Sequence, residues 1–452
     1  MSATLAAAGQ IVVPALSKAK PLRLPTVSDT ELDSGLRVLA VRRPGVPLVE
    51  FRLRIPFTAP PGRAVGQHVA RSQLLSDTLL SGTAEHGAAD LAAAIQALGG
   101  AITASVDADR LGLGGSVLAS SLPALLDLLA EVLVSASYPS EEVVGERERL
   151  VQELAIHRSQ AGVVAREVLL HRMYGAHPYG HDLPQPEEIE RVTAAALRTL
   201  HGRRVAPQGA VLTLVGDLQP AKATAAAAQA LQAWAPTSAS RRTPAPPAIP
   251  PPGAALLVDR PGAVQTTLRL AGPAPSRGTP DAAAFTLANL VFGGYFSSRW
   301  VSNIREDKGY TYSPHAQVEH PAAGSRVVIS ADVATDVTAP ALLETRYELG
   351  RIATVAVGQD ELDQARRYAI GTLALGTASQ AGLASTISVL AGAGLELGYL
   401  REHQRALEAA TVDEVLAAGA RYLAPANLTT VLVGDAANIT GPLRRLIDIE
   451  DA

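Results

Sequence analysis

The chain has 452 residues, of which 47% are hydrophobic and 18% charged, so it has enough apolar surface for sizeable cores and too little charge for a disordered protein. At roughly 150 residues per domain, this length predicts two large domains or about three smaller ones. The net charge of −4 provides no overall positive field, so we expect no nucleic-acid partner. The absence of cysteine excludes disulfides, thiolate catalysis and cysteine-ligated metals.

The N-terminal residues lack the basic segment and apolar run of a secretory signal, so we expect a cytoplasmic protein. Residues 368–395 are uncharged and long enough to span a bilayer, but many polar residues interrupt them. We therefore predict two buried helices of a soluble fold there, and no membrane partner.

Strand and helix patterns follow one another through the first half of the chain. Residues 48–56 alternate apolar and polar side chains, as a half-buried strand does. From similar patterns we predict helices at 69–81 and 89–98, paired strands at 101–107 and 111–118, and long amphipathic helices at 122–135 and 140–159. Such a grouping predicts an α+β domain with helices packed on one face of an antiparallel-rich sheet.

Residues 236–253 are too rich in proline for a helix or a central strand, and we predict an extended linker there. An internal repeat relates the two halves that this linker joins. In each half a threonine-capped helix precedes an Ala-Pro pair and a strand ending in Val-Gly-Asp, and the two copies are 218 residues apart. The sequence therefore predicts two homologous domains, at 30–235 and 254–452, after an N-terminal extension at 1–29.

The common catalytic motifs are missing from this sequence. It contains no phosphate-binding Gly-x-x-x-x-Gly-Lys loop, no Gly-x-Ser-x-Gly elbow and no His-Glu-x-x-His helix. The ten histidines are scattered, and the nearest group, His171, His177 and His181, is interrupted by Pro178. We expect surface or packing roles for these histidines.

Several short motifs nevertheless occur in the order found in one peptidase family. They are Gly82-Thr83, Leu98-Gly99-Gly100, the segment 146–153, His177-Pro178-Tyr179-Gly180, the two Val-Gly-Asp strands and the segment 293–312. In these the chain resembles the pitrilysin/insulinase family of zinc peptidases, in the subgroup of half-length, two-domain chains typified by mitochondrial processing peptidase. The resemblance covers nearly the whole chain and implies that two such chains form a clamshell.

In active members of that family a helix carries His-x-x-Glu-His, whose imidazoles bind Zn²⁺ while the Glu activates the bound water. Aligned on Gly82-Thr83, the resemblance implies that Gln73, Ser76 and Asp77 stand at those three positions, and Glu153 at the third zinc ligand. Both histidines and the base are absent. Two carboxylates without an imidazole make a poor zinc site, so we predict a degenerate site and no metal in this chain. The alternative for Glu153, and for Glu146 before it, is an ordinary polar position on an amphipathic helix.

Residues 293–312 resemble the signature of the family's C-terminal half, with a glycine turn, a serine-capped helix and a turn into a strand. Arg305 and Tyr312 match, in identity and spacing, a pair that projects into the peptidase chamber. The resemblance implies that they donate hydrogen bonds to the peptide carbonyl and its oxyanion. Gly293 and Gly294 stand where a substrate-binding glycine loop would lie, although this loop is shorter than the family's. The alternative is a helix-end cation at 305 and a half-buried strand aromatic at 312.

Together these features imply the inactive subunit of a heterodimeric zinc endopeptidase that cleaves short or unfolded peptides, such as leaders or presequences. A catalytic partner would supply His-x-x-Glu-His and zinc, and this chain would supply Arg305, Tyr312 and half of the chamber. One alternative is an inert peptide-binding or scaffold protein of the same fold. A self-contained hydrolase is a further alternative, but the sequence has no nucleophile–base pattern for it.

Overall fold

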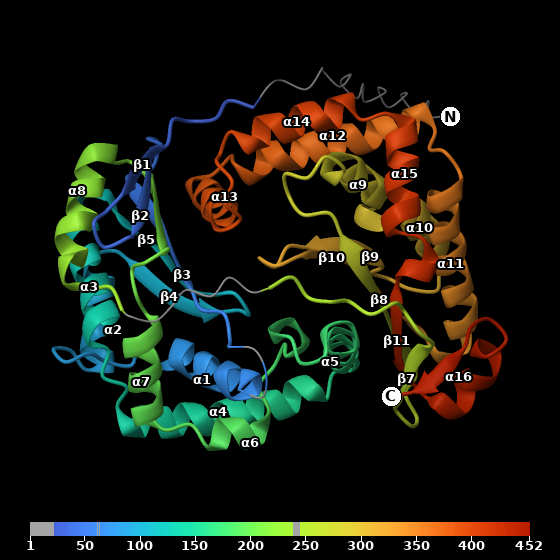
Figure 1. Ribbon diagram of the computed structural model, residues 1–452, viewed down its shortest axis with the longest axis horizontal. Helices are drawn as coiled ribbons and strands as arrows, with labels where there is room; N and C mark the ends of the chain where they lie inside the picture. Colours follow the sequence, from blue (N-terminus) through green and yellow to red (C-terminus); the bar gives the residue numbers. More distant parts are fainter. Residues whose placement is uncertain (1–21, 61, 63, 238–244) are drawn as a thin grey trace, which may run out of the picture.

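The computed structural model describes residues 22–60, 62, 64–237 and 245–452. Within them the chain forms two six-stranded sheets with helices packed against both, and the sheets lie on opposite sides of the molecule (Figure 1). This confirms the two homologous α+β units that the sequence predicts.

The first sheet has the strand order β1-β2-β6-β3-β5-β4. Its central strand β6 is buried at every residue, and it pairs parallel with β2 and antiparallel with β3. The outer strand β4 pairs antiparallel with β5, as predicted. The strands are β1 (Ser28–Glu31), β2 (Arg37–Arg42), β3 (Leu48–Pro56), β4 (Ala101–Val106), β5 (Arg110–Leu118) and β6 (Val211–Gly216).

The second sheet repeats this arrangement, with the order β12-β7-β11-β8-β10-β9. Here β11 takes the place of β6, because it is buried throughout, parallel to β7 and antiparallel to β8. The two Val-Gly-Asp segments therefore end equivalent central strands, and the sequence repeat is a repeat of topology. The strands are β7 (Ala255–Asp259), β8 (Gln265–Ala274), β9 (His315–Glu319), β10 (Ser325–Ala334), β11 (Thr429–Gly434) and β12 (Ile449–Asp451).

The helices of the first half agree closely with the sequence prediction, except that α1 begins and ends earlier than expected. Its first turn includes His68, which is buried and whose Nε2 is paired with the carbonyl oxygen of Phe57 at 2.8 Å. The helices are α1 (Val65–Thr78), α2 (Ala88–Ala97), α3 (Leu122–Ser135), α4 (Ser140–Arg158), α5 (Ala161–Tyr174), α6 (Pro186–Glu190), α7 (Ala194–Arg204) and α8 (Pro220–Ala230).

The two predicted threonine caps are present. Thr193 Oγ1 accepts from the backbone N–H of Ala196 at 3.2 Å, and Thr411 forms a reciprocal capping box with Glu414. The helices of the second half are α9 (Ala282–Asn289), α10 (Arg299–Val301), α11 (Thr338–Thr354), α12 (Gln359–Gly376), α13 (Gln380–Gly392), α14 (Tyr399–Ala409), α15 (Val412–Tyr422) and α16 (Ala436–Leu443).

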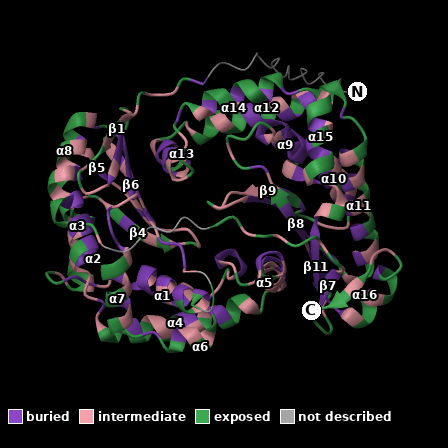
Figure 2. Ribbon diagram, in the orientation of Figure 1, coloured by how far each residue is buried: buried purple, intermediate pink, exposed green. Residues whose placement is uncertain are grey.

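One helix of each half packs against the sheet of the other half. Leu383 and Ile387 of α13 pack against β2 and β6 of the first sheet, while Leu169 and Met173 of α5 pack against β8, β10 and β11 of the second. The remaining helices of each half form a core on the other face of their own sheet. Figure 2 shows the buried residues along both sheets. The predicted domain boundaries at 235 and 254 stay predictions, because the packing crosses between the halves.

Residues 368–395 form the end of α12 and all of α13. In the described part of the chain no single helix is long and apolar enough to cross a membrane, and α12 and α13 meet that measure only as a pair bent by 105°. Of the predicted linker, residues 238–244 lie outside the described residues, and Ile249 packs beside α5.

Candidate functional site

The three degenerate positions, which correspond to two zinc ligands and the base of active family members, lie on α1, which packs against α4 and against the outer strand β4. Gln73 donates from Nε2 to both carboxylate oxygens of Asp77, at 3.0 and 3.1 Å. Ser76 is buried, and its hydroxyl has no hydrogen-bond partner among the residues that the structure describes. The hydrogen-bonding groups at these three positions are therefore only partly paired with one another.

The predicted third ligand, Glu153, lies on α4 with Glu146 two helical turns before it. Both carboxylates bind the guanidinium of Arg149, which stands between them in sequence. Burial raises the pKa of Asp77 to about 6; the Gln73 amide and Arg149 oppose this rise, and the charges of Glu146 and Glu153 add to it. The acidic residues of this site are thus partly neutralised by an arginine of the same chain.

Arg305 lies in a π-helical segment, Ser302–Asp307, that is held firmly in the second half. Ile304 is fully buried, and Asn303 donates from Nδ2 to Glu344 and Glu348 of α11, at 3.0 Å each. The segment ends where Gly309 takes φ of +66°, a left-handed conformation that favours glycine. The backbone N–H of Tyr310 then bonds the carbonyl of Ile304 at 2.8 Å, so the chain turns back on itself.

This turn brings Arg305 and Tyr312 together. The Arg305 guanidinium carbon lies 5.0 Å from the centroid of the Tyr312 ring and 4.4 Å from that of Phe296. Tyr312 is 81% exposed and precedes β9, so the alternative of a half-buried strand aromatic is wrong. The structure therefore presents a stacked arginine and an exposed phenol at the surface of the second half.

Gly293 and Gly294 do not form the predicted turn, because they end a π-helical segment, Leu290–Gly294. Gly293 is buried, and a Cβ there would lie 2.9 Å from the Trp300 ring, which gives a packing reason for glycine. Ser298 stands at the N-cap of α10, as predicted, but its side chain makes no capping hydrogen bond. The substrate-binding role of the two glycines stays a prediction.

Arg305 and Tyr312 do not meet the degenerate zinc positions within this chain. Gln73 lines a cavity of about 550 Å³ between the two halves, and neither Arg305 nor Tyr312 is among the described residues that line it. In Figure 1, α10, just before Arg305, lies in the other half from α1. The two sets of residues therefore do not line this cavity together.

Two family models match successive parts of the chain. Insulinase (peptidase family M16) matches residues 71–187, and the peptidase M16 inactive domain matches residues 191–368. The chain belongs to the M16 peptidase family. An uncharacterized zinc protease of Mycobacterium tuberculosis is 26% identical to this M16 chain over 424 residues, 91% of the chain and 94% of the relative. One of Streptomyces coelicolor is 23% identical over 370 residues, 78% and 77% of the two chains.

Solved structures place the M16 chain in the same fold. A crystal structure of a peptidase M16 inactive domain from Pseudomonas fluorescens superposes with a TM-score of 0.81 at 26% identity, covering 90% of this chain and 98% of that one. A protease from Helicobacter pylori superposes with a TM-score of 0.83 at 18% identity, covering 91% and 100%. The second likeness shows the fold alone.

The residues of this M16 chain do not fit the zinc ion of its family. No imidazole stands at 73 or 77, and Glu153 already binds a cation, Arg149, that would repel a divalent metal. Among the described residues, one group of three His, Asp or Glu side chains brings its ligand atoms within 4.8 Å, and it lies elsewhere.

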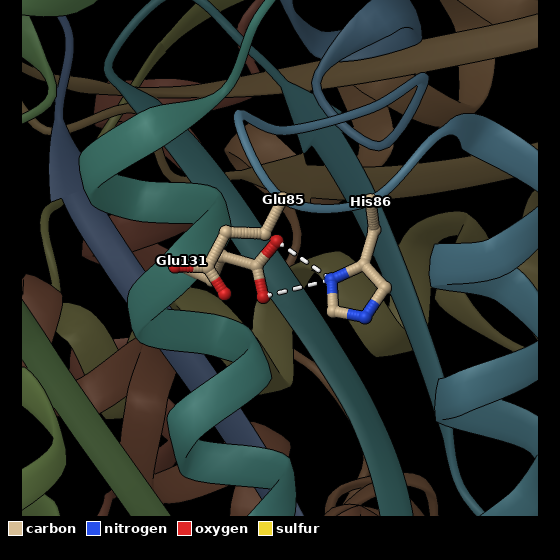
Figure 3. Close-up of side chains that lie close together, drawn as sticks. All are labelled: Glu85, His86 and Glu131. Carbon is tan, nitrogen blue, oxygen red and sulfur yellow. Dashed lines mark hydrogen bonds and ion pairs between the residues drawn. The ribbon is translucent and has the colours of Figure 1, made fainter.

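That group is Glu85, His86 and Glu131, which the sequence analysis did not single out (Figure 3). His86 Nδ1 lies 2.9 and 3.1 Å from the two oxygens of Glu131, and the Thr83 hydroxyl also donates to that carboxylate. The bond to Glu131 raises the pKa of His86. Both Glu131 oxygens are therefore already engaged in holding the Gly82-Thr83 loop onto α3.

Proposed function

We propose that this chain is the non-catalytic subunit of a heterodimeric M16 endopeptidase that cleaves short or unfolded peptides. In this proposal a partner carries the zinc site, and this chain contributes Arg305 and Tyr312 to the peptide-binding chamber. The observation that carries the proposal is a contrast between two parts of the chain. Helix α1 lacks the imidazole ligands that zinc needs, whereas Arg305 and Tyr312 form an exposed, stacked pair on a firmly held turn.

The chemistry of the pair suits a peptide carbonyl. A guanidinium and a phenol are both hydrogen-bond donors at neutral pH, and neither has to change its protonation state to serve. Stacking occupies the faces of the Arg305 guanidinium, and its Nε lies 3.3 Å from a carboxylate oxygen of Glu306. Its terminal N–H groups stay able to donate. Two such donors stabilise the negative charge that develops on a carbonyl oxygen during attack by water.

The position of the pair also suits an extended peptide. Tyr312 is three residues before β9, the outer strand of the second sheet. An extended peptide adds readily to an exposed strand edge, and side-chain donors near that edge then reach its carbonyls. The exclusion of folded proteins would follow from enclosure between two such chains.

Reconstitution tests this function. The full chain is mixed with a half-length M16 chain of the same organism that carries His-x-x-Glu-His. Cleavage of an unstructured peptide is followed with each chain alone and with both. We expect cleavage only by the mixture, and its loss on addition of a zinc chelator. Equal cleavage by the partner alone would contradict the proposal and favour an inert scaffold or peptide-binding protein.

A further inference from the structure

The cavity between the two halves has an unusual set of charges. It measures about 550 Å³, within the range of small-molecule sites, and is lined by β3, α1, the β4–β5 turn, the loop after β8, β9 and the end of α13. Five arginines line it. They are Arg54, Arg110, Arg166, Arg277 and Arg326.

Three of these arginines bind carboxylates, although Nη1 of Arg326 is buried without a hydrogen-bond partner in the described residues. Arg110 binds Asp107 at 2.9 Å. Arg166 binds Asp182 and Glu319 at 2.7 Å each, and Arg326 also donates to Glu319. The remaining acid of the cavity, Asp109, accepts from the Tyr179 hydroxyl and from the backbone N–H of Ala322, both at 2.8 Å.

Arg54 and Arg277 make no hydrogen bond or ion pair with the described part of the chain, and both are half-buried. Burial lowers the pKa of each guanidinium. The charge of Arg110 lowers the pKa of Arg54 further, and the carboxylates of Asp107 and Asp109 partly oppose this. Arg54 lies against the backbone at the end of α13, where a Cβ on Gly392 would be 2.2 Å from its Nε. A half-buried cation without a hydrogen-bonded acceptor is incompletely compensated, so both guanidinium groups can still bind an anion.

A second cavity of about 490 Å³ adjoins the first and shares Arg277, Val318 and His320 with it. Burial, with the nearby charges of Arg277 and His403, lowers the pKa of His320 to about 4, so at neutral pH Arg277 alone carries charge at this boundary. Apolar side chains line much of the second cavity. They are Phe285, Leu290, Leu373, Leu390 and Leu400.

We propose that the two cavities together bind a small amphipathic anion. Its carboxylate lies between Arg54 and Arg277, where planar guanidinium groups bind it through paired N–H donors, and its apolar tail enters the second cavity. The site joins strand β3 of the first half to the loop after β8 in the second, so the ligand bridges the two halves. This proposal is independent of the peptidase function proposed above.

The test uses octanoate with the purified full chain, measured by calorimetry and by thermal unfolding. Inorganic phosphate is the control for an anion without an apolar chain, and octanol is the control for an apolar chain without a charge. We expect one octanoate per chain, a rise in Tm with octanoate concentration, and little effect of phosphate or octanol. Arg277→Gln and Arg54→Gln should each weaken octanoate binding by about tenfold or more.

Arg405→Gln, at an exposed position of α14, is the matched control and should bind octanoate as the wild type does. Without ligand, Arg277→Gln and Arg54→Gln should unfold at a Tm close to that of the wild type, because neither loses a hydrogen bond or an ion pair. Absence of octanoate binding, or equal binding by Arg277→Gln and Arg405→Gln, overturns the site. An equal effect of phosphate or octanol overturns the two-part ligand.

Discussion

The guanidinium of Arg305 stacks on the ring of Tyr312, seven residues further along the chain, with 5.0 Å between the guanidinium carbon and the ring centroid. Phe296 covers the same guanidinium at 4.4 Å. The left-handed turn at Gly309 makes this contact possible by reversing the chain after the π-helical segment. The two donors are therefore positioned by local structure before any partner or peptide arrives.

Phe296→Ala should loosen Arg305 without removing it. An exposed cation–π contact contributes about 0.5–1 kcal/mol, so stability should change little while turnover by the reconstituted complex falls several-fold. Steady-state cleavage with complex formation checked by size exclusion measures this. Leu343→Ala is the control, because it removes an exposed apolar side chain at a different place, on α11. Unchanged turnover in Phe296→Ala would show that stacking does not position Arg305.

The purified wild-type chain should retain no stoichiometric zinc after dialysis. Replacing Gln73 and Asp77 with His and Ser76 with Glu rebuilds the motif, but Arg149 still binds Glu153. Adding Arg149→Gln to those three changes should therefore tighten zinc binding by about tenfold, as metal-site neighbours commonly do. Competition with a chromogenic chelator measures both affinities. One tightly held zinc in the wild type, or no effect of Arg149→Gln, would contradict the account.

Asp77→Asn should stabilise the chain at neutral pH. The pKa of Asp77 is raised from 3.8 to about 6 in the folded chain, so between these values the folded state binds more protons than the unfolded state. The free energy of unfolding therefore decreases as pH rises through this window, and the penalty is complete above about pH 6. Asn at 77 removes the penalty, with an expected gain of about 1–2 kcal/mol at pH 7.5 after allowance for solvent screening.

Urea denaturation of Asp77→Asn and wild type at pH 7.5, 6 and 4 measures this difference, which should vanish at pH 4. Asp127→Asn, an exposed position on α3, is the control and should show no such trend. A constant difference at all three pH values would mean that the titration of Asp77 is not its cause.

Because α5 and α13 each pack against the sheet of the other half, the two halves should unfold together. Leu383→Ala truncates a fully buried side chain of α13 and should cost about 2–5 kcal/mol. The only two tryptophans, Trp234 and Trp300, lie in the cores of the first and second halves, so single-tryptophan variants report each half separately. We expect the same midpoint and the same shift from both. Leu375→Ala, exposed on α12, should shift neither, and a shift seen by one tryptophan alone would contradict coupled unfolding.

Local pattern predicts most of this fold because its elements are long and strongly periodic. The capping box of Thr411 and the helix α3 needed no tertiary information. The early start of α1 escaped prediction because His68 is polar in sequence but buried in the fold. There its ring nitrogen pairs with the backbone carbonyl of Phe57. The sequence marks α13 as buried, but which sheet it covers depends on contacts between residues hundreds of positions apart.

The site shows the same division between local and distant information. The spacing Glu146-x-x-Arg149-x-x-x-Glu153 is that of helical ion pairs. The sequence alone could therefore have predicted that Arg149 binds both carboxylates, although the prediction above considers only the two acids. The sequence could not predict that Arg54 and Arg277 lack hydrogen-bonded acceptors, because this depends on how every acid around the cavity is paired. Motif order indicates the family, whereas charge pairing requires the structure.

The central claim is that this chain supplies catalytic donors to a partner's active site, and Tyr312→Phe tests it most directly. This change removes one hydroxyl from an 81% exposed side chain and leaves the ring that stacks on Arg305. The measurement is kcat of the reconstituted complex, with Tyr347→Phe, an exposed tyrosine of α11, as the matched control. Loss of one oxyanion donor predicts a fall of about 10²–10³ in kcat for Tyr312→Phe, with assembly intact and no change in Tyr347→Phe. Equal turnover by all three complexes would contradict the claim.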